Sequence, residues 1–293
     1  MHEHAHHAAE LAHLDWDVLR RALVAVWAVA LGSGPIGVFL MLRRMSLMGD
    51  VMSHAILPGV AIGYLAAGSI SLTAMTLGGL GAGLVVALLA GAVARLTALH
   101  EDASLAAFYL LSIALGVLIL SRTGSSEEML HLLFGELFDI EPSGLLLVAA
   151  ITSVSLVGLA AIWRPLVVEC ADPGFLRSVS RAGGPVHLVF LVLVMLNLIA
   201  AFHALGTLLA VGVMMLPAAG ARMWTRDLGR MVALAVAAGG AAGTAGVFYA
   251  QAFGVPAGPS VVLAAGLFYL ASLFFGPYGG LARRLIRPRH LEA

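Results

Sequence analysis

The stretch 47–59 is mostly apolar but contains an acid and a histidine four residues apart, Asp50 and His54. On a helix these two side chains share one face, because residues i and i+4 are neighbours on the helix surface. A carboxylate and an imidazole form a partial ligand set for zinc, manganese or ferrous iron. Pro58 lacks a backbone N–H, so it frees a carbonyl one turn earlier to face a cavity. In the alternative interpretation, Asp50 caps the helix start and bonds Ser53, and His54 bonds another helix.

His203 and His131 are two further candidate metal ligands. His203 lies between two apolar stretches, six residues after Asn197, whose amide suits a hydrogen bond between helices. His203 meets Asp50 only if the stretch around Asp50 enters deeply or the stretch before His203 is broken. His131 lies in an acidic segment, where it either relays an incoming cation or simply packs.

Residues 1–17 form a polar, His-rich stub without the pattern of a cleavable signal peptide. Imidazoles at this density bind zinc, copper or nickel loosely, so the stub either collects ions or is an unselected tail. Its histidines are His2, His4, His6, His7 and His13.

The composition predicts a membrane protein. Apolar residues make up 61% of the chain and charged residues 11%, whereas soluble domains are about a quarter charged. A spanning helix needs about 20 mostly apolar residues. Nine stretches qualify, and eight or ten spans remain open: 18–42, 47–67, 72–94, 103–121, 143–163, 186–201, 204–224, 229–251 and 259–276. The expected fold is an all-α, polytopic transmembrane helix bundle, in which Asp50 is the only acid inside a span.

The arginines predict the orientation, since cytoplasmic loops carry an excess of positive charge. With nine spans, all arginines except Arg20, Arg21 and Arg122 fall on one side, which we take as cytoplasmic. The N-terminus is then outside and the C-terminus inside. The expected organisation is the stub 1–17, a permease domain 18–277 and a basic cytoplasmic tail 278–293. Pairs of glycines at i and i+4 let these helices approach closely: Gly79 with Gly83, and Gly239 with Gly243.

The chain contains no lysine, so it cannot contain the G-x-x-x-x-G-K-[ST] loop that binds ATP phosphates. If ATP drives the protein, a separate subunit binds it. The loop 164–185 suits docking of such a subunit: Asp172 and Pro173 start a short helix at about 172–184. Gly183 and Gly184 end that helix. The alternative is a helix that lies on the membrane surface.

Several motifs, in order, resemble the permease subunits of the zinc/manganese/iron family of ABC importers. The resemblance covers about residues 30–277. It rests on the following segments: Arg43 to Asp50 with His54 and Pro58-Gly59; Leu133-Phe134-Gly135; 172–184; Gly206 to Leu209 with Leu216 to Ala219; and Pro256 to Leu263.

The resemblance implies a homodimer in a bacterial inner or plasma membrane, with two ATPase subunits and an extracytoplasmic metal-binding protein as partners. It implies no cofactor in this chain, a divalent metal as the transported substrate, and Asp50 and His54 along the path. Zinc, manganese and iron stay open. Three other classes compete: an ion-coupled secondary transporter without an ATPase, an intramembrane metalloprotease, and a permease for a chelated metal or cobalamin. The protease would need a full ligand set within the spans, and a chelate would need a wide apolar path.

Overall fold

The computed structural model describes residues 2–68, 71–97, 101–121, 137–138, 140–172, 175, 183–278 and 280–281. Throughout these residues the regular secondary structure is helical, which confirms the all-α prediction. The principal helices are α1 (His2–Leu42), α2 (Ser46–Ala55), α3 (Leu57–Ala67), α4 (Leu72–Leu96), α5 (Glu101–Leu120), α7 (Pro142–Ala171), α9 (Gly183–Leu205), α10 (Thr207–Trp224), α11 (Leu228–Phe253) and α12 (Ala257–Phe275).

Each of the nine predicted stretches is helical. Seven helical segments in the described residues are long and apolar enough to cross a membrane, with α2 and α3 together supplying one of them. Two shorter apolar segments, Ala106–Ile119 in α5 and Leu209–Trp224 in α10, occupy the remaining predicted stretches. The chain is therefore a multi-pass integral membrane protein.

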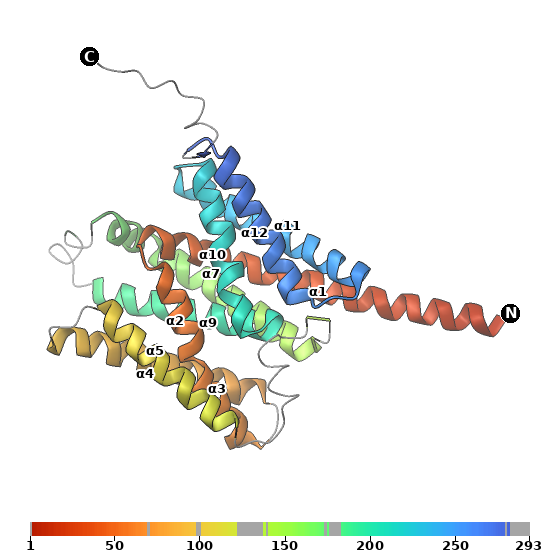
Figure 1. Cartoon of the computed structure of the whole chain (residues 1–293), viewed down its shortest axis with the longest axis horizontal. Helices are drawn as coiled ribbons and strands as arrows, with labels where there is room; N and C mark the ends of the chain where they lie inside the picture. Colours follow the sequence, from red (N-terminus) through yellow and green to blue (C-terminus); the bar gives the residue numbers. More distant parts are fainter. Residues whose placement is uncertain are drawn as a thin grey trace, which may run out of the picture.

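Helices α1 and α9 form the centre of the bundle (Figure 1). In each of them 72% of the most apolar window is buried, against 22% in α4. Helix α11 packs along α1, and α12 packs on α10 and α11. The pairs α3–α4 and α4–α5 pack together on the other side of α2 and α9. Helix α2 therefore lies between the centre and this outer group.

Helix α2 is separated from α3 by a single residue, Ile56. Pro58 is the second residue of α3, and its ring nitrogen has no hydrogen to give to the carbonyl of His54. Ile56 keeps a helical conformation, and its N–H donates to the Met52 carbonyl at 3.2 Å. The break therefore interrupts the hydrogen-bond ladder without turning the chain back.

Glycine allows close helix packing, as the two predicted pairs indicated. A Cβ on Gly79 would lie 2.7 Å from a methyl of Ile56, and one on Gly243 would lie 2.8 Å from a valine of α1. The closest approach is between α3 and α4, where a Cβ on Gly59 would collide with the carbonyl oxygen of Gly78. Only a residue without a side chain fits there.

Two tight corners join helices at the ends of the bundle. After α1, the N–H of Met45 donates to the Leu40 carbonyl at 2.9 Å, and that of Arg44 donates to Met41 at 3.1 Å. This is the pairing of a Schellman motif, and it holds Arg44 in the left-handed region at φ 58°. Between α9 and α10 the only linking residue is Gly206, at φ 90° and ψ 161°.

Two predicted boundaries near residue 172 are wrong. The predicted loop began at residue 164, but α7 continues through Pro165 to Ala171. Gly183 opens α9 instead of closing the preceding helix, so the sixth span is longer than predicted, with 23 residues. Of the short helix predicted at 172–184, residues 173–174 and 176–182 lie outside the described part, as does most of the tail 278–293.

Candidate functional site

Asp50 and His54 lie side by side on α2, as their spacing predicted. Oδ1 of Asp50 is 3.9 Å from Nε2 of His54, which is too long for a hydrogen bond. The Asp50 side chain is 53% exposed within the chain and that of His54 only 14%. Both groups thus keep lone pairs available, with the carboxylate on the open side and the imidazole set into the bundle.

The alternative interpretation, in which Asp50 caps the helix start and its side chain bonds Ser53, is not supported. Helix α2 begins at Ser46 after Met45, so Asp50 lies inside the helix and caps nothing. Ser53 does bond to Asp50, but its hydroxyl donates to the backbone carbonyl at 2.7 Å and leaves the carboxylate untouched. Neither helix capping nor a hydrogen bond to Ser53 therefore accounts for the Asp50 carboxylate.

The imidazole of His54 is positioned by α5. Its ring meets the ring of Tyr109 edge to face, with centroids 5.1 Å apart and planes at 73°. Nδ1 of His54 is buried and has no hydrogen-bond partner in the described part of the chain. A buried ring nitrogen without a partner is uncommon and points to a ligand or a water at this position.

His203 does not join this pair in a group of three metal ligands within the described residues. His203 is in the last turn of α9, where its ring packs on Phe202 and its buried Nε2 has no hydrogen-bond partner within the described residues. No group of three or more His, Cys, Asp or Glu side chains suited to one metal ion occurs in the described ranges. His131 lies outside the described residues. Of the predicted ligands that the structure describes, Asp50 and His54 are thus the two that lie together.

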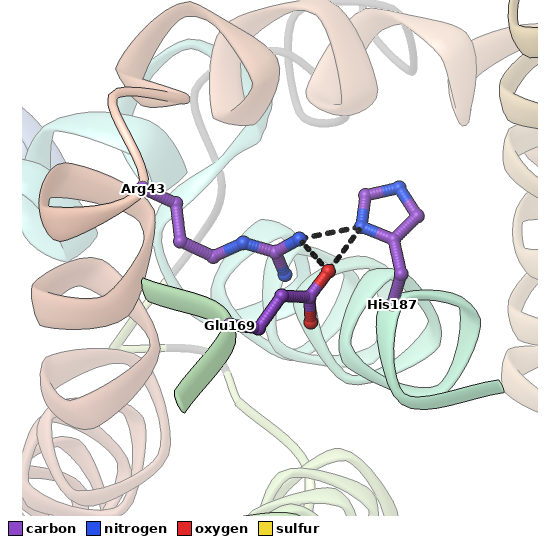
Figure 2. A network of polar contacts seen from close by, with 3 residues as sticks. All are labelled: Arg43, Glu169 and His187. Atoms are coloured by element: carbon purple, nitrogen blue, oxygen red, sulfur yellow. Dashed lines mark hydrogen bonds and ion pairs between the residues drawn. The ribbon is translucent and has the colours of Figure 1, made fainter. Parts of the chain in front are cut away.

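The structure contains a second polar cluster that the sequence did not predict (Figure 2). Nη2 of Arg43 lies 2.8 Å from Oε1 of Glu169 and 2.7 Å from Nδ1 of His187. The Arg43 and Glu169 side chains are each only 8% exposed. The three residues come from the α1–α2 corner, the end of α7 and the start of α9. We call them the corner network.

The hydrogen-bond geometry fixes the state of His187. A guanidinium can only donate, so Nδ1 of His187 must accept from Arg43 and carries no hydrogen. His187 is then neutral, with its proton on Nε2. Its 4.0 Å approach to Oε1 of Glu169 is accordingly a close contact and not an ion pair. The single ion pair of the corner network is between Arg43 and Glu169.

An aromatic layer lies beside the corner network and joins the same three helices. Phe39 of α1 meets Trp163 of α7 with ring centroids 5.1 Å apart, and Phe190 of α9 at 6.3 Å. The guanidinium of Arg43 lies 5.1 Å from the Phe190 ring centroid, within reach of a cation–π interaction. Apolar packing thus holds these helix ends together independently of the ion pair.

The sequence contained little sign of the corner network. The predicted loop contained Glu169, and Glu169 becomes a buried membrane acid only because α7 continues past Pro165. The prediction that Asp50 is the only acid inside a span is therefore wrong. The available signal was the apolar run Leu166-Val167-Val168, which extends the preceding pattern as far as Glu169.

Asn197 makes the interhelical hydrogen bond that its position suggested. Its Nδ2 donates to Oγ of Ser155 on α7 at 2.6 Å and to the Leu193 carbonyl at 2.9 Å. Asn197 and Ser155 are both buried, and Gly32 of α1 makes room for the Asn197 amide oxygen. The role of Asn197 is accordingly to join α7 and α9.

Sequence comparison places these features among transport proteins. The manganese transport system membrane protein MntC of Halalkalibacterium halodurans is 31% identical over 280 residues, covering 95% of this chain and 94% of that protein. The manganese import system permease protein ScaB of Streptococcus gordonii is 28% identical over 273 residues, covering 93% and 96%. The zinc transport system membrane protein TroC of Treponema pallidum is 30% identical over 282 residues, covering 94% of each.

Structure and family comparison agree with these relatives. A chain in the structure of PsaBC from Streptococcus pneumoniae in complex with Fab superposes with a TM-score of 0.83 at 28% identity. The match covers 92% of this chain and 95% of that one. The ABC 3 transport family matches residues 15–276. The resemblance noted in the sequence is therefore confirmed, and the chain belongs to the ABC 3 transport family.

Proposed function

We propose that this chain is the membrane permease subunit of an ABC importer that carries manganese or zinc, with iron as a third candidate ion. Relatives with whole-chain similarity are named as manganese and zinc transport proteins. The observation that carries the proposal is the pair Asp50 and His54, whose oxygen and nitrogen atoms are the donors that these ions bind.

The cost of placing an acid in a membrane helix supports a functional role for Asp50. A central charged residue costs about 2.5–3.5 kcal/mol on insertion scales, so such residues usually have a partner or a purpose. His54 is too far away to bond Asp50, and Ser53 bonds only the backbone. The ion supplies the missing partner during passage. Backbone carbonyls, water and, as further candidates, His203 and His131 complete its coordination.

The proposed topology has nine crossings, an external N-terminus and a cytoplasmic C-terminus. Contacts between distant segments support it. The corner network gathers the α1–α2 corner, the end of α7 and the start of α9 at one end of the bundle. The N–H of Tyr278 donates to the Met223 carbonyl at 2.9 Å, so the end of α12 lies beside the α10–α11 link. Both groups are rich in arginine, as expected of a cytoplasmic face.

The proposed assembly is a homodimer with ATPase subunits that dock at about 172–184 and an extracytoplasmic metal-binding protein. Asp172 Oδ1 accepts a hydrogen bond from the N–H of Phe175 at 2.9 Å, which is the hydrogen bond of an N-cap, and the Phe175 side chain is exposed. An exposed aromatic at the first turn of a helix suits a groove on a partner. Hydrolysis of ATP belongs to that partner, because this chain has no lysine for a phosphate-binding loop.

Transport in this scheme needs no covalent step in the chain. The loaded binding protein docks outside, and the ion passes to Asp50 and His54. ATP binding in the partner subunits then moves the docking segments and changes which side of the bundle is open. The ion then leaves towards the cytoplasm.

Reconstitution tests the proposal. The chain is co-expressed with its neighbouring ATPase and binding protein, and ATP hydrolysis and metal uptake are measured in liposomes with manganese, zinc and iron. We expect one metal to stimulate hydrolysis and accumulate inside, and Asp50→Asn or His54→Ala to abolish both effects. Asp17→Asn, the same exchange at an exposed site in the first helix, should change neither. Unchanged uptake in Asp50→Asn would remove the assigned role, and transport without an ATPase would favour a secondary transporter.

A further inference from the structure

We propose that the corner network transmits movement between the docking segment, at about 172–184, and α2, the helix that carries Asp50 and His54. This inference depends on the proposed function, since it assigns a coupling role within that transport cycle. The corner network contains the ion pair that links the end of α7 to Arg43, the first residue after α1 in the α1–α2 corner (Figure 2). Arg43 and Glu169 are then positioning residues, which act on the ion through Asp50 and His54.

One end of the corner network is attached to the docking segment. Glu169 lies three residues before Asp172, whose N–H still donates to the Val168 carbonyl at 2.9 Å. The side chain of Asp172 in turn accepts from Phe175. Hydrogen bonds therefore connect the last turn of α7 to the first residue described beyond it, and a displacement of the docking segment reaches Glu169 directly.

The other end is attached to α2. Arg43 is followed by the Schellman motif, in which both Arg44 and Met45 are bonded back to α1. Helix α2 begins at Ser46, so no flexible residue separates the motif from the helix that carries Asp50. A shift of Arg43 therefore changes the position of α2 instead of being absorbed in a loop.

The ion pair is not needed to hold these helices together. The aromatic layer of Phe39, Trp163 and Phe190 already joins α1, α7 and α9. Buried ion pairs generally stabilise a protein no more than apolar residues of similar volume. A charged pair at this site is therefore better explained by a need for a switchable contact than by stability.

The geometry leaves room for a second arrangement. Nη1 of Arg43 and Oε2 of Glu169 are both buried and have no hydrogen-bond partner in the described ranges. Arginine and carboxylate groups often pair through two parallel hydrogen bonds, which here would join Nη1 to Oε2 as well. In the structure only one arm of such a fork is made, from Nη2 to Oε1. A change to this fork would give the corner network a second pairing beside the one observed, and a coupling element needs two such arrangements.

The test separates a loss of coupling between ATP hydrolysis and metal uptake from a loss of assembly of the complex. The complex of this chain, its ATPase and its binding protein is reconstituted with the Glu169→Gln and His187→Leu variants, and metal ions taken up per ATP hydrolysed are measured. We expect the ATPase to co-purify at the wild-type ratio and continue to hydrolyse ATP, while the ions carried per ATP fall at least about tenfold. Arg164→Gln removes an exposed charge from the same helix and should keep the wild-type ratio.

The outcomes separate the two proposals. If the wild-type complex takes up metal and Glu169→Gln carries as many ions per ATP as wild type, the coupling role is overturned and the proposed function stands. If the wild-type complex takes up none of the three metals, the proposed function itself fails. Should Glu169→Gln fail to assemble, Glu169→Asp replaces it: this variant keeps the charge but shortens the reach, so coupling predicts a lower ratio and a purely structural role an unchanged one.

Discussion

The ring of His54 on α2 packs edge to face against the ring of Tyr109 on α5, with centroids 5.1 Å apart. This contact fixes the direction in which the imidazole nitrogens point, because His54 has little other polar support. Residues that orient a metal ligand affect metal affinity even though they do not touch the ion.

We therefore expect Tyr109→Ala to raise the KM for metal uptake by about ten- to a hundredfold, the usual cost of losing a residue that supports a ligand. Tyr109→Phe keeps the ring and should leave the KM near the wild-type value. Uptake by the reconstituted complex at varied metal concentration measures both. A Tyr109→Ala variant with wild-type KM would mean that the ring contact does not position His54.

Gly59 should be intolerant of any side chain. A Cβ there meets the carbonyl oxygen of Gly78, which is backbone and cannot rotate away. We expect Gly59→Ala to lower the free energy of unfolding by about 1–3 kcal/mol, the range for overpacked cores. Thermal unfolding of the purified protein in detergent measures the effect. Gly81→Ala is the matched control on α4, since nothing lies within 4 Å of the added atom.

The hydrogen bond between Asn197 and Ser155 can be measured by a double-mutant cycle. The Nδ2–Oγ distance of 2.6 Å indicates a direct bond between α9 and α7. Hydrogen bonds between membrane helices contribute about 0.6 kcal/mol on average and up to about 1.7 kcal/mol. We expect a coupling energy in this range from Asn197→Ala, Ser155→Ala and the double variant in chemical unfolding. A coupling energy of zero would show that the two side chains do not interact in the membrane.

The membrane orientation can be tested with cysteines. In a Cys170→Ala background, Val255→Cys in the α11–α12 link should react with an impermeant maleimide on intact cells. Thr225→Cys in the α10–α11 link should react only after permeabilisation, because the nine-crossing topology puts that link inside. The reverse pattern would invert the proposed topology, and labelling of both sites on intact cells would show that α11 does not cross the membrane.

The arrangement of spans and the Asp50–His54 pair could be predicted because both depend on local rules. Apolar stretches of sufficient length became helices, and residues i and i+4 fell on one face of α2. The corner network could not be predicted, because Arg43 is more than a hundred residues from its two partners and Glu169 is buried only through tertiary packing. His203 shows the same limit: whether it reaches Asp50 depends on how deeply the helices enter the bundle, which the sequence does not specify.

Gly206 has a consequence for how sequences of this fold can diverge. Its backbone angles, φ 90° and ψ 161°, lie in a region open essentially to glycine alone. Gly68 and Gly254 also have positive φ, at 65° and 63°, but in the left-handed helical region that asparagine tolerates. A saturation library should therefore accept asparagine at 68 and 254 and select glycine alone at 206. Residue 206 therefore cannot change by neutral drift unless an insertion lengthens the link between α9 and α10.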